Sequence, residues 1–453
     1  MVNSNQEMTS EKQIGVIGGG LVGSLMSLYL VERGYRVSVY ERRKDPRIYK
    51  IDGGRSINLA LSRRGIKALE EVGLGHVLQQ TAIPMTGRMM HDLQGNLTFQ
   101  PYGKEGQFIN SVSRTELNKL LIDAAEARGV QFFFDHRCLH VDMEQSVLTF
   151  KNGGASFNKK LDAIIGADGA FSTARLAMQL TDRFDYSQEF IEHGYKEFHI
   201  PATSDGSFAM TKNALHIWPR ESYMLIALPN LDGSFTGTLF FPFEGSTSFE
   251  GLKDALQFER FFASTFPDAL KLIPDLREQY MENPTSSLVT VRCFPWHINQ
   301  TFLIGDAAHA IVPFYGQGMN AGFEDCRVLN ELLGAFDNDL ERALPEFERS
   351  RKPDTDAIAG LALDNFIEMR DLVADPDFLL RKKIEARIHQ LYPTRWIPLY
   401  SMVTFHEEIR YSDALKQGQE QKKIMDKIMQ IPRIEAIWQT SDFQPILHQI
   451  MGD

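Results

Sequence analysis

Three glycines near the start of the chain, Gly18, Gly20 and Gly23, have the spacing Gly-x-Gly-x-x-Gly. Glycines at this spacing let a backbone turn tightly and approach a pyrophosphate, which the N-terminus of the following helix stabilises. Glu41 lies 18 residues after Gly23, where a carboxylate accepts hydrogen bonds from a ribose hydroxyl pair. The pattern predicts a dinucleotide site, and the acid favours FAD or NAD over NADP. Arg42 and Arg43 are typical either of the border of such a site or of an ordinary charged surface.

Later in the chain, two apolar runs are each followed by an Asp beside a Gly. Asp168-Gly169 follows the run in "IIGADGAFSTAR", and Gly305-Asp306 follows the run in "FLIGDAAHA". An Asp at the end of a buried strand, beside the start of a helix, can accept a hydrogen bond from a sugar or ribityl hydroxyl. Either pair alone is more typical of a turn, so the two matter only together with the glycine turn.

The stretch "PFYGQGMNAGFED", Pro313 to Asp325, predicts a helix that begins with glycines instead of a Ser or Asp cap. A helix N-terminus without a side-chain cap offers unpaired N–H groups and the positive end of the helix dipole. We expect the backbone N–H groups near Gly318, Met319 and Asn320 to face an electron-rich ligand.

The elements that must position these residues follow from periodicity. A strand over Gln13–Ile17, a helix over Leu21–Arg33 and a strand over Arg36–Tyr40 form a βαβ unit. Ser113 and Glu116 have capping-box spacing at the start of a further helix. Short β-rich runs between about 190 and 300 predict an antiparallel sheet. From 341 onward the pattern is mostly helical, and we expect its prolines to interrupt the helices.

The totals exclude several classes of protein. The chain has 453 residues, 43% of them hydrophobic, and a net charge of −11 without a basic block, which argues against a nucleic-acid partner. Three cysteines without CxxC spacing predict a reduced, cytoplasmic protein. The ends of the chain predict no signal peptide and no transmembrane anchor. His216 and His309 have no partners at metal-ligand spacing, so we interpret both as structural and expect no metal.

The glycine turn, the Asp168 motif and the Asp306 motif, in this order, resemble the FAD-dependent aromatic hydroxylases of the p-hydroxybenzoate hydroxylase type over about residues 12–335. The resemblance implies an α/β fold: a Rossmann-like FAD-binding domain (1–190 and 288–340), interleaved with an antiparallel β-sheet substrate domain (191–287), and a C-terminal helical domain (341–453) that closes the substrate pocket. It also implies tightly but non-covalently bound FAD. The implied cofactor-binding residues are Gly18, Gly20, Val22, Gly23, Tyr40, Glu41, Arg42, Arg43, Ala60, Arg114, Leu139, Asp168, Asp306, Gly318, Met319 and Asn320.

Within that family, the segments "GRSINLALSRRG", "GRMMH", "HGYKEF", "LHIWPR", "DNFIEM" and "IPLYSMVTF" are similar to the kynurenine-hydroxylating members. This implies hydroxylation of L-kynurenine to 3-hydroxy-L-kynurenine with O₂ and transiently bound NADPH, through a flavin C4a-hydroperoxide, in tryptophan degradation and NAD biosynthesis. The implied substrate-binding residues are Arg88, Tyr102, Asn365 and Tyr400, with Phe314, Met224, Ile226 and Phe240 as candidates for the slot that holds the aromatic ring.

The flavin carries the chemistry in that mechanism, so we expect no obligatory catalytic side chain, with Phe314 and Gly318 lining the flavin. Tyr315 is a departure, because relatives are expected to have Phe or His there. The end of the chain is another, because eukaryotic relatives have a C-terminal anchor; a bacterial-type enzyme without an anchor is therefore expected. Two alternatives stay open: a flavin hydroxylase of another aromatic compound, and a non-catalytic FAD-binding redox sensor.

Overall fold

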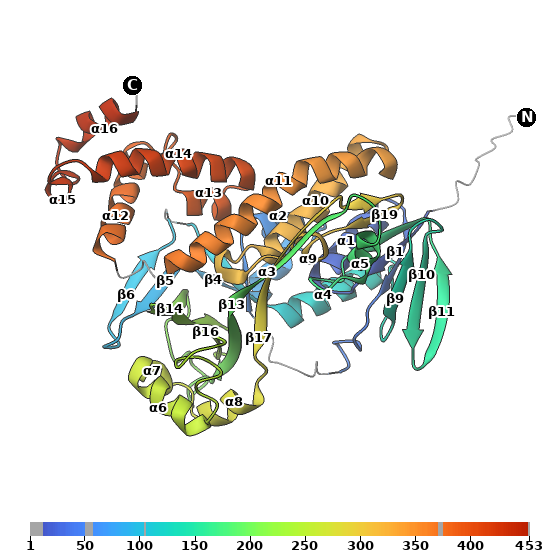
Figure 1. Cartoon of the computed structure of the whole chain (residues 1–453), viewed down its shortest axis with the longest axis horizontal. Helices are drawn as coiled ribbons and strands as arrows, with labels where there is room; N and C mark the ends of the chain where they lie inside the picture. Colours follow the sequence, from blue (N-terminus) through green and yellow to red (C-terminus); the bar gives the residue numbers. More distant parts are fainter. Residues whose placement is uncertain (1–11, 50–57, 104–105, 370–374, 452–453) are drawn as a thin grey trace, which may run out of the picture.

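Two large sheets and a group of C-terminal helices make up the protein in this computed structural model, which describes residues 12–49, 58–103, 106–369 and 375–451 (Figure 1). The first part of the motif "GRSINLALSRRG", residues 54–57, lies outside the described residues, as do residues 1–11. The first sheet has the strand order β18-β19-β12-β1-β2-β8. Its strands are β1 (Gln13–Ile17), β2 (Arg36–Tyr40), β8 (Gln131–Phe133), β12 (Ala163–Gly166), β18 (His297–Ile298) and β19 (Thr301–Leu303).

The six-stranded sheet is parallel except for β18, and helices cover it. Strand β1 is a continuous apolar run whose Ile14 and Val16 have no exposed surface, which is typical of a strand buried on both faces. Helix α1 (Leu21–Glu32) joins β1 to β2 and packs against α4 (Arg114–Ala127) and α10 (Gly318–Ala335). The predicted βαβ unit is therefore present, with its helix one residue shorter than expected. The Ser113 hydroxyl also caps α4, accepting a hydrogen bond from the Glu116 N–H.

The second sheet has seven strands in the order β17-β13-β16-β15-β14-β5-β6. Neighbouring strands are antiparallel, as expected, except that β5 runs parallel to β14. This sheet is larger than the one expected for the 191–287 region. It also includes β17, and it includes β5 and β6 from the region expected to belong to the FAD-binding part. The strands are β5 (Gly87–His91), β6 (Leu97–Pro101), β13 (Asp185–Ile200), β14 (Ala214–Arg220), β15 (Tyr223–Pro229), β16 (Phe235–Pro242) and β17 (Ser286–Phe294).

Side-chain alternation gives the seven-stranded sheet two different faces. Trp218, Leu225 and Phe241 point to one face, where a core forms with α6 (Ala255–Thr265), α7 (Pro267–Leu270) and α8 (Leu276–Glu282). Met224 and Phe240 are directly opposite each other on neighbouring strands and point to the other face, toward the start of α10 and the C-terminal helices. The second face is therefore the one that can border a site shared with the six-stranded sheet.

The C-terminal helices are α11 (Leu340–Ile367), α12 (Pro376–Leu391), α13 (Leu399–Phe405), α14 (Tyr411–Met429), α15 (Ile434–Ile437) and α16 (Phe443–Met451). The expectation that prolines interrupt this region is wrong for α11, which continues through Pro345 and Pro353. Proline removes one helical hydrogen bond and disfavours a helix interior. Packing against α10 and α14 along the length of α11 outweighs that penalty.

Shorter elements connect these layers. Two small sheets have the orders β3-β7-β4 and β11-β10-β9. Their strands are β3 (Asn58–Leu61), β4 (Ala82–Met85), β7 (Ile109–Ser113), β9 (Arg137–Asp142), β10 (Val147–Asn152) and β11 (Ala155–Lys160). The short helices are α2 (Arg63–Glu71), η1 (Gly75–Val77), α3 (Leu78–Thr81), α5 (Thr173–Gln179), α9 (Asp306–His309) and η2 (Pro313–Tyr315).

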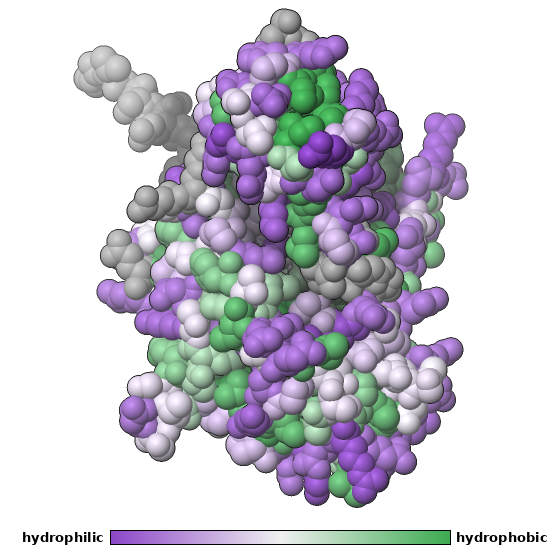
Figure 2. Space-filling model, turned by 90° about the vertical axis from the view of Figure 1, so that its left-hand side faces the viewer, coloured by the Kyte–Doolittle hydropathy of each residue, from purple (hydrophilic) through white to green (hydrophobic). Residues whose placement is uncertain are grey.

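The face turned toward the viewer in Figure 2 mixes hydrophilic and hydrophobic side chains, and hydrophobic ones gather at its top, over the C-terminal helices. Among the described residues, no helix combines the length and the apolar character that a membrane span requires.

Candidate active site

The glycine turn after β1 leaves no room for side chains. Gly18 has a φ of +105°, and a Cβ there would lie 2.4 Å from the Ala167 carbonyl oxygen. A Cβ on Gly23 would lie 2.0 Å from the Gly18 carbonyl oxygen. Gly20 precedes the first residue of α1, has no side-chain cap and faces open space. The turn therefore packs tightly against the protein on one side and presents the bare N-terminus of α1 on the other, which suits a pyrophosphate.

The three motifs meet at one edge of the six-stranded sheet. Strands β1, β12 and β19 are parallel neighbours, so their carboxyl ends lie together. The Ala167 N–H donates to the Ile17 carbonyl at 2.9 Å, and the Ile304 N–H donates to the Gly166 carbonyl at 3.0 Å. A site in a crevice outside the carboxyl ends of parallel strands is the usual place for a dinucleotide.

Asp168 brings an unsatisfied acceptor to this edge. Its Oδ2 accepts hydrogen bonds from the Thr173 N–H at 2.6 Å and the Ala174 N–H at 3.4 Å. Its Oδ1 is buried and has no hydrogen-bond partner among the described residues. Burial raises the pKa of Asp168, although its hydrogen bonds act in the opposite direction. A buried acceptor without a donor fits a hydroxyl of a bound cofactor such as FAD. Asp306, by contrast, is exposed at the first position of α9, after Gly305 with a φ of +59°.

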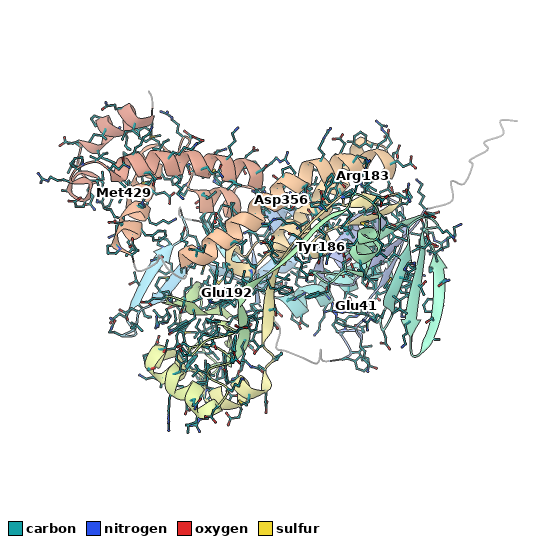
Figure 3. All side chains as sticks on the ribbon, in the orientation of Figure 1. Glu41, Arg183, Tyr186, Glu192, Asp356 and Met429 are labelled. Atoms are coloured by element: carbon teal, nitrogen blue, oxygen red, sulfur yellow. The ribbon has the colours of Figure 1, made fainter. Side chains whose placement is uncertain are left out.

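Glu41 directly follows β2 (Figure 3), and its carboxylate is already hydrogen-bonded within the protein. Its Oε2 accepts from the Gly19 N–H at 2.9 Å, and its Oε1 accepts from Arg43 Nε at 2.8 Å. Burial acts to raise the pKa of Glu41, but the Arg43 guanidinium and two backbone N–H groups outweigh it, so the pKa is lowered. Arg43 also donates from its backbone N–H to Oε1 at 2.9 Å and from Nη2 to Oε2 at 3.3 Å. The carboxylate thus braces the glycine turn with all four of its acceptor positions engaged, so a ribose hydroxyl would have to replace one of the Arg43 hydrogen bonds. Arg42 is exposed beside it.

The start of α10 has the bare N-terminus that the sequence predicted. Gly316 adopts a φ of +66°, and Gln317 is the N-cap residue without a side-chain cap. By helix geometry, the N–H groups of Gly318, Met319 and Asn320 have no acceptor within the helix. The Asn320 side chain accepts from the Ser62 N–H at 2.9 Å and donates to the carbonyls of Ala60 and Gly316 at 2.9 and 2.8 Å. It therefore holds the loop in place, which leaves only its backbone N–H for a ligand.

The other expected cofactor residues lie in different surroundings. Val22 packs where α1 meets Gly305 and Gly322, because a Cβ on either glycine would contact its methyl groups. The Tyr40 ring stacks between Phe133 and Phe150 in the core, so only its backbone lies at the glycine turn.

Leu139, on β9, and Arg114, at the start of α4, lie further from the glycine turn in the sequence. Leu139 is at a β-bulge, where Cys138 and His140 pair with successive residues of β10, and a bulge residue is left outside the ladder. Its backbone is therefore free of strand pairing, as contact with an adenine requires. Arg114 is exposed at the first position of α4 and lies close enough to Glu197 to lower the pKa of that carboxyl.

Arg88 is a half-buried cation beside a cluster of aromatic rings. It lies on the face of β5 that points toward η2, with its guanidinium 4.6 Å from the centre of the Tyr400 ring and 5.6 Å from that of Tyr102. Among the described residues it has no ion pair with a carboxylate. Burial acts to lower the pKa of Arg88, but the Tyr400 and Tyr102 hydroxyls and the Glu368 carboxylate outweigh it and raise the pKa. The guanidinium is charged, and a ligand carboxylate is the partner its geometry fits.

Three tyrosines form a column beside Arg88. The Tyr400 ring stacks on Tyr102 at 5.7 Å and on Tyr315 at 5.4 Å. The Tyr102 hydroxyl is buried and has no hydrogen-bond partner among the described residues. Tyr315, the departure noted in the sequence, therefore joins α13 to η2 through its contact with Tyr400. The structure brings Arg88, Tyr102 and Tyr400 together from β5, the segment after β6, and α13.

Asn365 is buried on α11 and reaches the loop before α10. Its side-chain N–H donates to the Phe314 carbonyl at 2.7 Å. The Phe314 ring stacks on Phe366 at 4.1 Å and approaches Phe240 at 4.9 Å. Asn365 therefore lies beside the expected ring slot and also fixes the backbone that forms one side of it.

The expected ring slot is one continuous apolar cluster. Phe240, Met224 and Phe314 are buried together, and Ile226 is partly buried against them. Glu197, which the sequence analysis did not single out, lies in the same face of the sheet opposite Thr238, which pairs in turn with Ile226. Burial raises the pKa of Glu197 to about 7, and Arg114 acts to lower it. Its segment "YKEFHI" also contains Lys196 and His199, so the sequence contained no signal that singled out Glu197.

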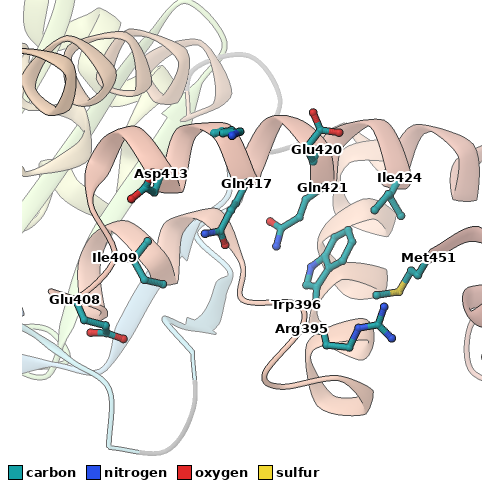
Figure 4. A pocket seen from close by; sticks show the side chains of 11 residues that line it. Arg395, Trp396, Glu408, Ile409, Asp413, Gln417, Glu420, Gln421, Ile424 and Met451 are labelled. Carbon is teal, nitrogen blue, oxygen red and sulfur yellow. The ribbon is translucent and has the colours of Figure 1, made fainter. Parts of the chain in front are cut away.

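A groove of about 630 Å³ lies elsewhere, among the C-terminal helices (Figure 4). Trp396, Ile409, Ile424 and Met451 contribute apolar side chains to it, and charged residues of both signs line its edges. It shares no lining residue with the cluster around Arg88, so we do not assign the chemistry to it.

The chain is similar to known proteins over most of its length. Residues 11–358 match the family described as FAD binding domain. The chain is 50% identical over 441 residues to kynurenine 3-monooxygenase of Flavobacterium johnsoniae, covering 96% of this chain and 98% of that protein. It is 46% identical over 432 residues to kynurenine 3-monooxygenase of Sus scrofa, covering 94% and 90% of the two chains. Among solved structures, 2-methyl-3-hydroxypyridine-5-carboxylic acid oxygenase superposes with a TM-score of 0.66 at 18% identity, covering 83% of this chain and 96% of that one. This last likeness concerns the fold alone.

Proposed function

The chain belongs to the kynurenine 3-monooxygenases, which are flavin-dependent aromatic hydroxylases, and from this premise we propose that it converts L-kynurenine to 3-hydroxy-L-kynurenine with NADPH and O₂. The observation that carries the proposal is Arg88, a half-buried guanidinium without an ion pair among the described residues, which lies beside the stacked rings of Tyr102 and Tyr400 and next to an apolar slot. A substrate with a carboxylate at one end and an aromatic ring at the other fits both features.

FAD would be held by the motifs at the sheet edge. The glycine turn and the α1 N-terminus face its pyrophosphate, Glu41 its ribose, and Asp168 a hydroxyl of its sugar or ribityl chain. When bound, FAD takes a hydride from NADPH and activates O₂ for transfer to the substrate ring. Only one dinucleotide fingerprint occurs in the sequence, which supports transient binding of NADPH without a nucleotide domain of its own.

Arg88 would bind the α-carboxylate of L-kynurenine with two parallel N–H bonds. Tyr102 has a hydroxyl without a partner that can donate to the same carboxylate, and the Tyr400 ring supports the guanidinium by a cation–π contact. Because a carboxylate loses its hydration on entering such a site, the matched cation is needed to replace it. These residues fix one end of the substrate and set the distance of its ring from the flavin.

The aromatic ring would lie in the slot between the sheet and η2. Met224, Ile226 and Phe240 form one wall, and Phe314 forms another. The apolar walls exclude water from the reacting carbon, which protects an activated oxygen species from wasteful breakdown. No protein nucleophile is required, because the amine of the substrate activates the ring carbon beside it.

The N-terminus of α10 would stabilise negative charge that develops on the flavin. Its unpaired N–H groups at Gly318, Met319 and Asn320 are fixed by the Asn320 side chain and by the φ of +66° at Gly316. Fixed donors and a helix dipole need no reorganisation during the reaction, which is the source of their catalytic benefit. Gly318 itself has no side chain, so the flavin edge can approach the backbone closely.

The proposal is tested by measuring substrate-dependent NADPH consumption together with the hydroxylated product. L-Kynurenine, aromatic amino acids and benzoates are compared with the FAD-loaded protein. The expected result is 3-hydroxy-L-kynurenine formed in step with NADPH consumption, and weak or no turnover of benzoates, which lack the amino-acid end. Faster, coupled turnover of another aromatic compound would replace L-kynurenine as the substrate.

A further inference from the structure

A buried polar network lies behind the strand that carries Arg88. His91 is at the end of β5, is 4% exposed and points to the face of the sheet opposite to that of Arg88. Its Nδ1 is 2.7 Å from Asp268 Oδ2, and its Nε2 is 2.9 Å from His216 Nδ1. The segments "GRMMH" and "LHIWPR" of the sequence, which supply His91 and His216, therefore meet here. His216, read from the sequence as structural, has its partner in this network.

The His216 end of the network fixes the position of two hydrogens. The Thr211 carbonyl only accepts hydrogen bonds, so His216 Nε2, at 2.9 Å from it, must carry a hydrogen. Burial lowers the pKa of His216 to about 4, so this ring is neutral near pH 7 and its Nδ1 is an acceptor. The hydrogen between the two histidines must therefore lie on His91 Nε2.

The Asp268 end fixes a third hydrogen. Burial acts to raise the pKa of Asp268, but hydrogen bonds from His91 and from Trp218 Nε1, the latter 2.8 Å long, outweigh it and lower the pKa. An ionised carboxylate only accepts hydrogen bonds, so His91 Nδ1 must donate to it. Both nitrogens of His91 then carry hydrogens, and the ring is an imidazolium balanced by the Asp268 carboxylate.

The remaining charged groups around His91 come from the neighbouring elements. Arg220 of β14 donates to the backbone carbonyls of His91 at 3.0 Å, Asp92 at 3.1 Å and Thr265 at 2.7 Å. Its positive charge opposes the imidazolium, which makes the Asp268 carboxylate more important. The Trp218 ring stacks on His91 with ring centres 3.9 Å apart. His91 is therefore held by β14 and α7 through its side chain and its backbone.

This network lies where the pairing of β5 with β14 ends; on its other side β5 still pairs with β6 there, with His91 opposite Leu97. The parallel register between β5 and β14 covers Gly87 to Met90, with Arg88 opposite Leu215, and His91 comes next. We propose that His91 is a positioning residue for substrate binding: held between Asp268 and His216, it fixes the end of β5 and thereby the direction of the Arg88 guanidinium. The inference rests on the proposed function, which assigns the substrate carboxylate to Arg88.

The two ends of the network can be broken separately. His91→Asn removes the ring and both of its hydrogen bonds, to Asp268 and to His216. Asp268→Asn keeps His91 beside His216 but replaces the charged acceptor of His91 and Trp218 by a neutral amide. Both changes loosen the end of β5, so both weaken L-kynurenine binding, and the larger loss is expected for His91→Asn.

The experiment measures kcat and KM for L-kynurenine and NADPH, and FAD content, for His91→Asn and Asp268→Asn. The matched control is His297→Asn, because His297 also pairs with a buried carboxylate, Glu348 at 3.0 Å, but lies on β18, outside the substrate sheet. His91→Asn is expected to raise the KM for L-kynurenine about fivefold, with kcat within about twofold of the original value. FAD content and the KM for NADPH are expected to stay unchanged.

Each outcome supports or overturns the inference. A KM for L-kynurenine that is raised in His91→Asn and, to a smaller extent, in Asp268→Asn supports it, provided that kcat, FAD content and the KM for NADPH stay near their original values and that His297→Asn behaves as the wild type. An unchanged KM in FAD-loaded His91→Asn overturns it. If His91→Asn does not fold, Asp268→Asn decides, and a KM equal to that of the wild type overturns it. Arg88→Met in the same assay separates the two proposals: an unchanged KM there would contradict the assignment of Arg88 itself, whatever His91 does.

Discussion

Asp168 and Tyr102 each have a buried polar atom without a hydrogen-bond partner among the described residues. Buried polar groups are nearly always paired in folded proteins, so both atoms are candidates for contact with a ligand. Asp168 lies at the edge of the six-stranded sheet, whereas Tyr102 lies beside Arg88 and the ring slot. The proposed function assigns the first place to the cofactor and the second to the substrate carboxylate.

Glu41→Ala is expected to weaken FAD binding by about 1–3 kcal/mol, because a charge-assisted acceptor for the ribose is lost. The structure adds a control, since Glu41 also pairs with Arg43 at 2.8 Å. Arg43→Ala keeps the carboxylate and removes this partner. Titration of the FAD-free proteins with FAD measures both variants. An equal loss in both would mean that Glu41 acts by bracing the turn with Arg43, not by contacting the ribose.

Glu197 predicts a pH-dependent stability. Burial raises its pKa from 4.5 to about 7, so the folded protein binds this proton more tightly than the unfolded chain. The contribution of Glu197 to stability is therefore greatest below about pH 4.5 and falls as the pH rises through about 7. Glu197→Gln is expected to leave Tm unchanged near pH 5 and to raise it by about 2 °C or more near pH 8. The control is Glu192→Gln, an exposed glutamate of the same strand (Figure 3). A constant Tm difference across this range would contradict the assignment.

At the scale of elements, the helices α1 and α10 both begin without a side-chain cap. Helix α1 begins after the glycine turn, and α10 begins after Gly316 and Gln317. Neither uses a Ser, Thr, Asp or Asn side chain to satisfy its first N–H groups. Helices α8, α13 and α14 also lack a side-chain cap, so it is the glycines at the starts of α1 and α10 that distinguish these two helices. The proposed function places the pyrophosphate at α1 and the flavin ring at α10.

Gly18→Ala tests whether the glycine turn needs close packing as well as a positive φ. A Cβ at Gly18 would lie 2.4 Å from a backbone oxygen, whereas Gly34, with a φ of +84°, has nothing within 4 Å. Gly34→Ala therefore has the same kind of backbone strain, about 1–2 kcal/mol, without the clash. We expect Gly18→Ala to abolish FAD binding and Gly34→Ala to retain it, as measured by flavin content after purification. Equal FAD retention would show that the turn tolerates a side chain.

The elements near the glycine turn could be predicted because their signals are local. Strand periodicity, glycine spacing and the Ser113 cap each depend on residues close in sequence, and β1, β2 and α4 form where expected. The composition of the seven-stranded sheet could not be predicted in the same way. Strands β5 and β6 join it from far away in the sequence, through a parallel pairing with β14 that no local pattern encodes. The expectation that the two prolines of α11 interrupt the helix was wrong for a related reason, since tertiary packing overrides local propensity.

At the scale of the whole molecule, buried ion pairs connect the C-terminal helices to the FAD-binding part. Arg64 of α2 pairs with Glu324 of α10 at 2.7 Å and donates to the Val403 carbonyl of α13 at 3.0 Å. Arg351 of α11 pairs with Glu324 at 2.7 Å and with Asp325 at 2.8 Å. The helix whose N-terminus serves the flavin is therefore anchored from both sides. Substrate-binding residues on α11 and α13 are held relative to it by the same network.

Arg351→Met is expected to destabilise the protein by about 3–5 kcal/mol, because it leaves the Glu324 and Asp325 carboxylates buried with less compensation. The exposed Arg349 of the same helix gives a matched control, since Arg349→Met removes only a surface pair with Glu346. Such surface pairs contribute about 1 kcal/mol or less. Denaturant unfolding of both variants, followed by flavin and tryptophan fluorescence, measures the difference. Similar midpoints would contradict a central role for the Arg351 network.

The site as a whole could be predicted only in part. Arg88, Tyr102, Asn365 and Tyr400 were proposed from family resemblance, and the structure places them around one cluster without testing their roles. The stacking of Tyr315 on Tyr400 and the position of Glu197 depend on contacts between distant segments, so sequence spacing contained no signal for either. Hydrogen bonds such as that from Asn365 to the Phe314 carbonyl likewise arise only from the packed fold.

The most direct test of the account is a comparison of two enzymes with two substrates. The enzymes are the wild type and Arg88→Met, and the substrates are L-kynurenine and its analogue without the carboxylate. If Arg88 binds the carboxylate, Arg88→Met should lower kcat/KM for L-kynurenine, with a loss of about 3 kcal/mol in transition-state binding. The analogue should be a poor substrate for both enzymes alike. The coupling energy between Arg88 and the substrate carboxylate should therefore be about 2 kcal/mol or more. Arg88→Lys, a point charge on a flexible stem, should raise the KM for L-kynurenine at least about tenfold. FAD content should stay normal in both variants. Equal losses for both substrates, or loss of FAD with near-normal kinetics in the remaining holoenzyme, would contradict the proposed binding mode.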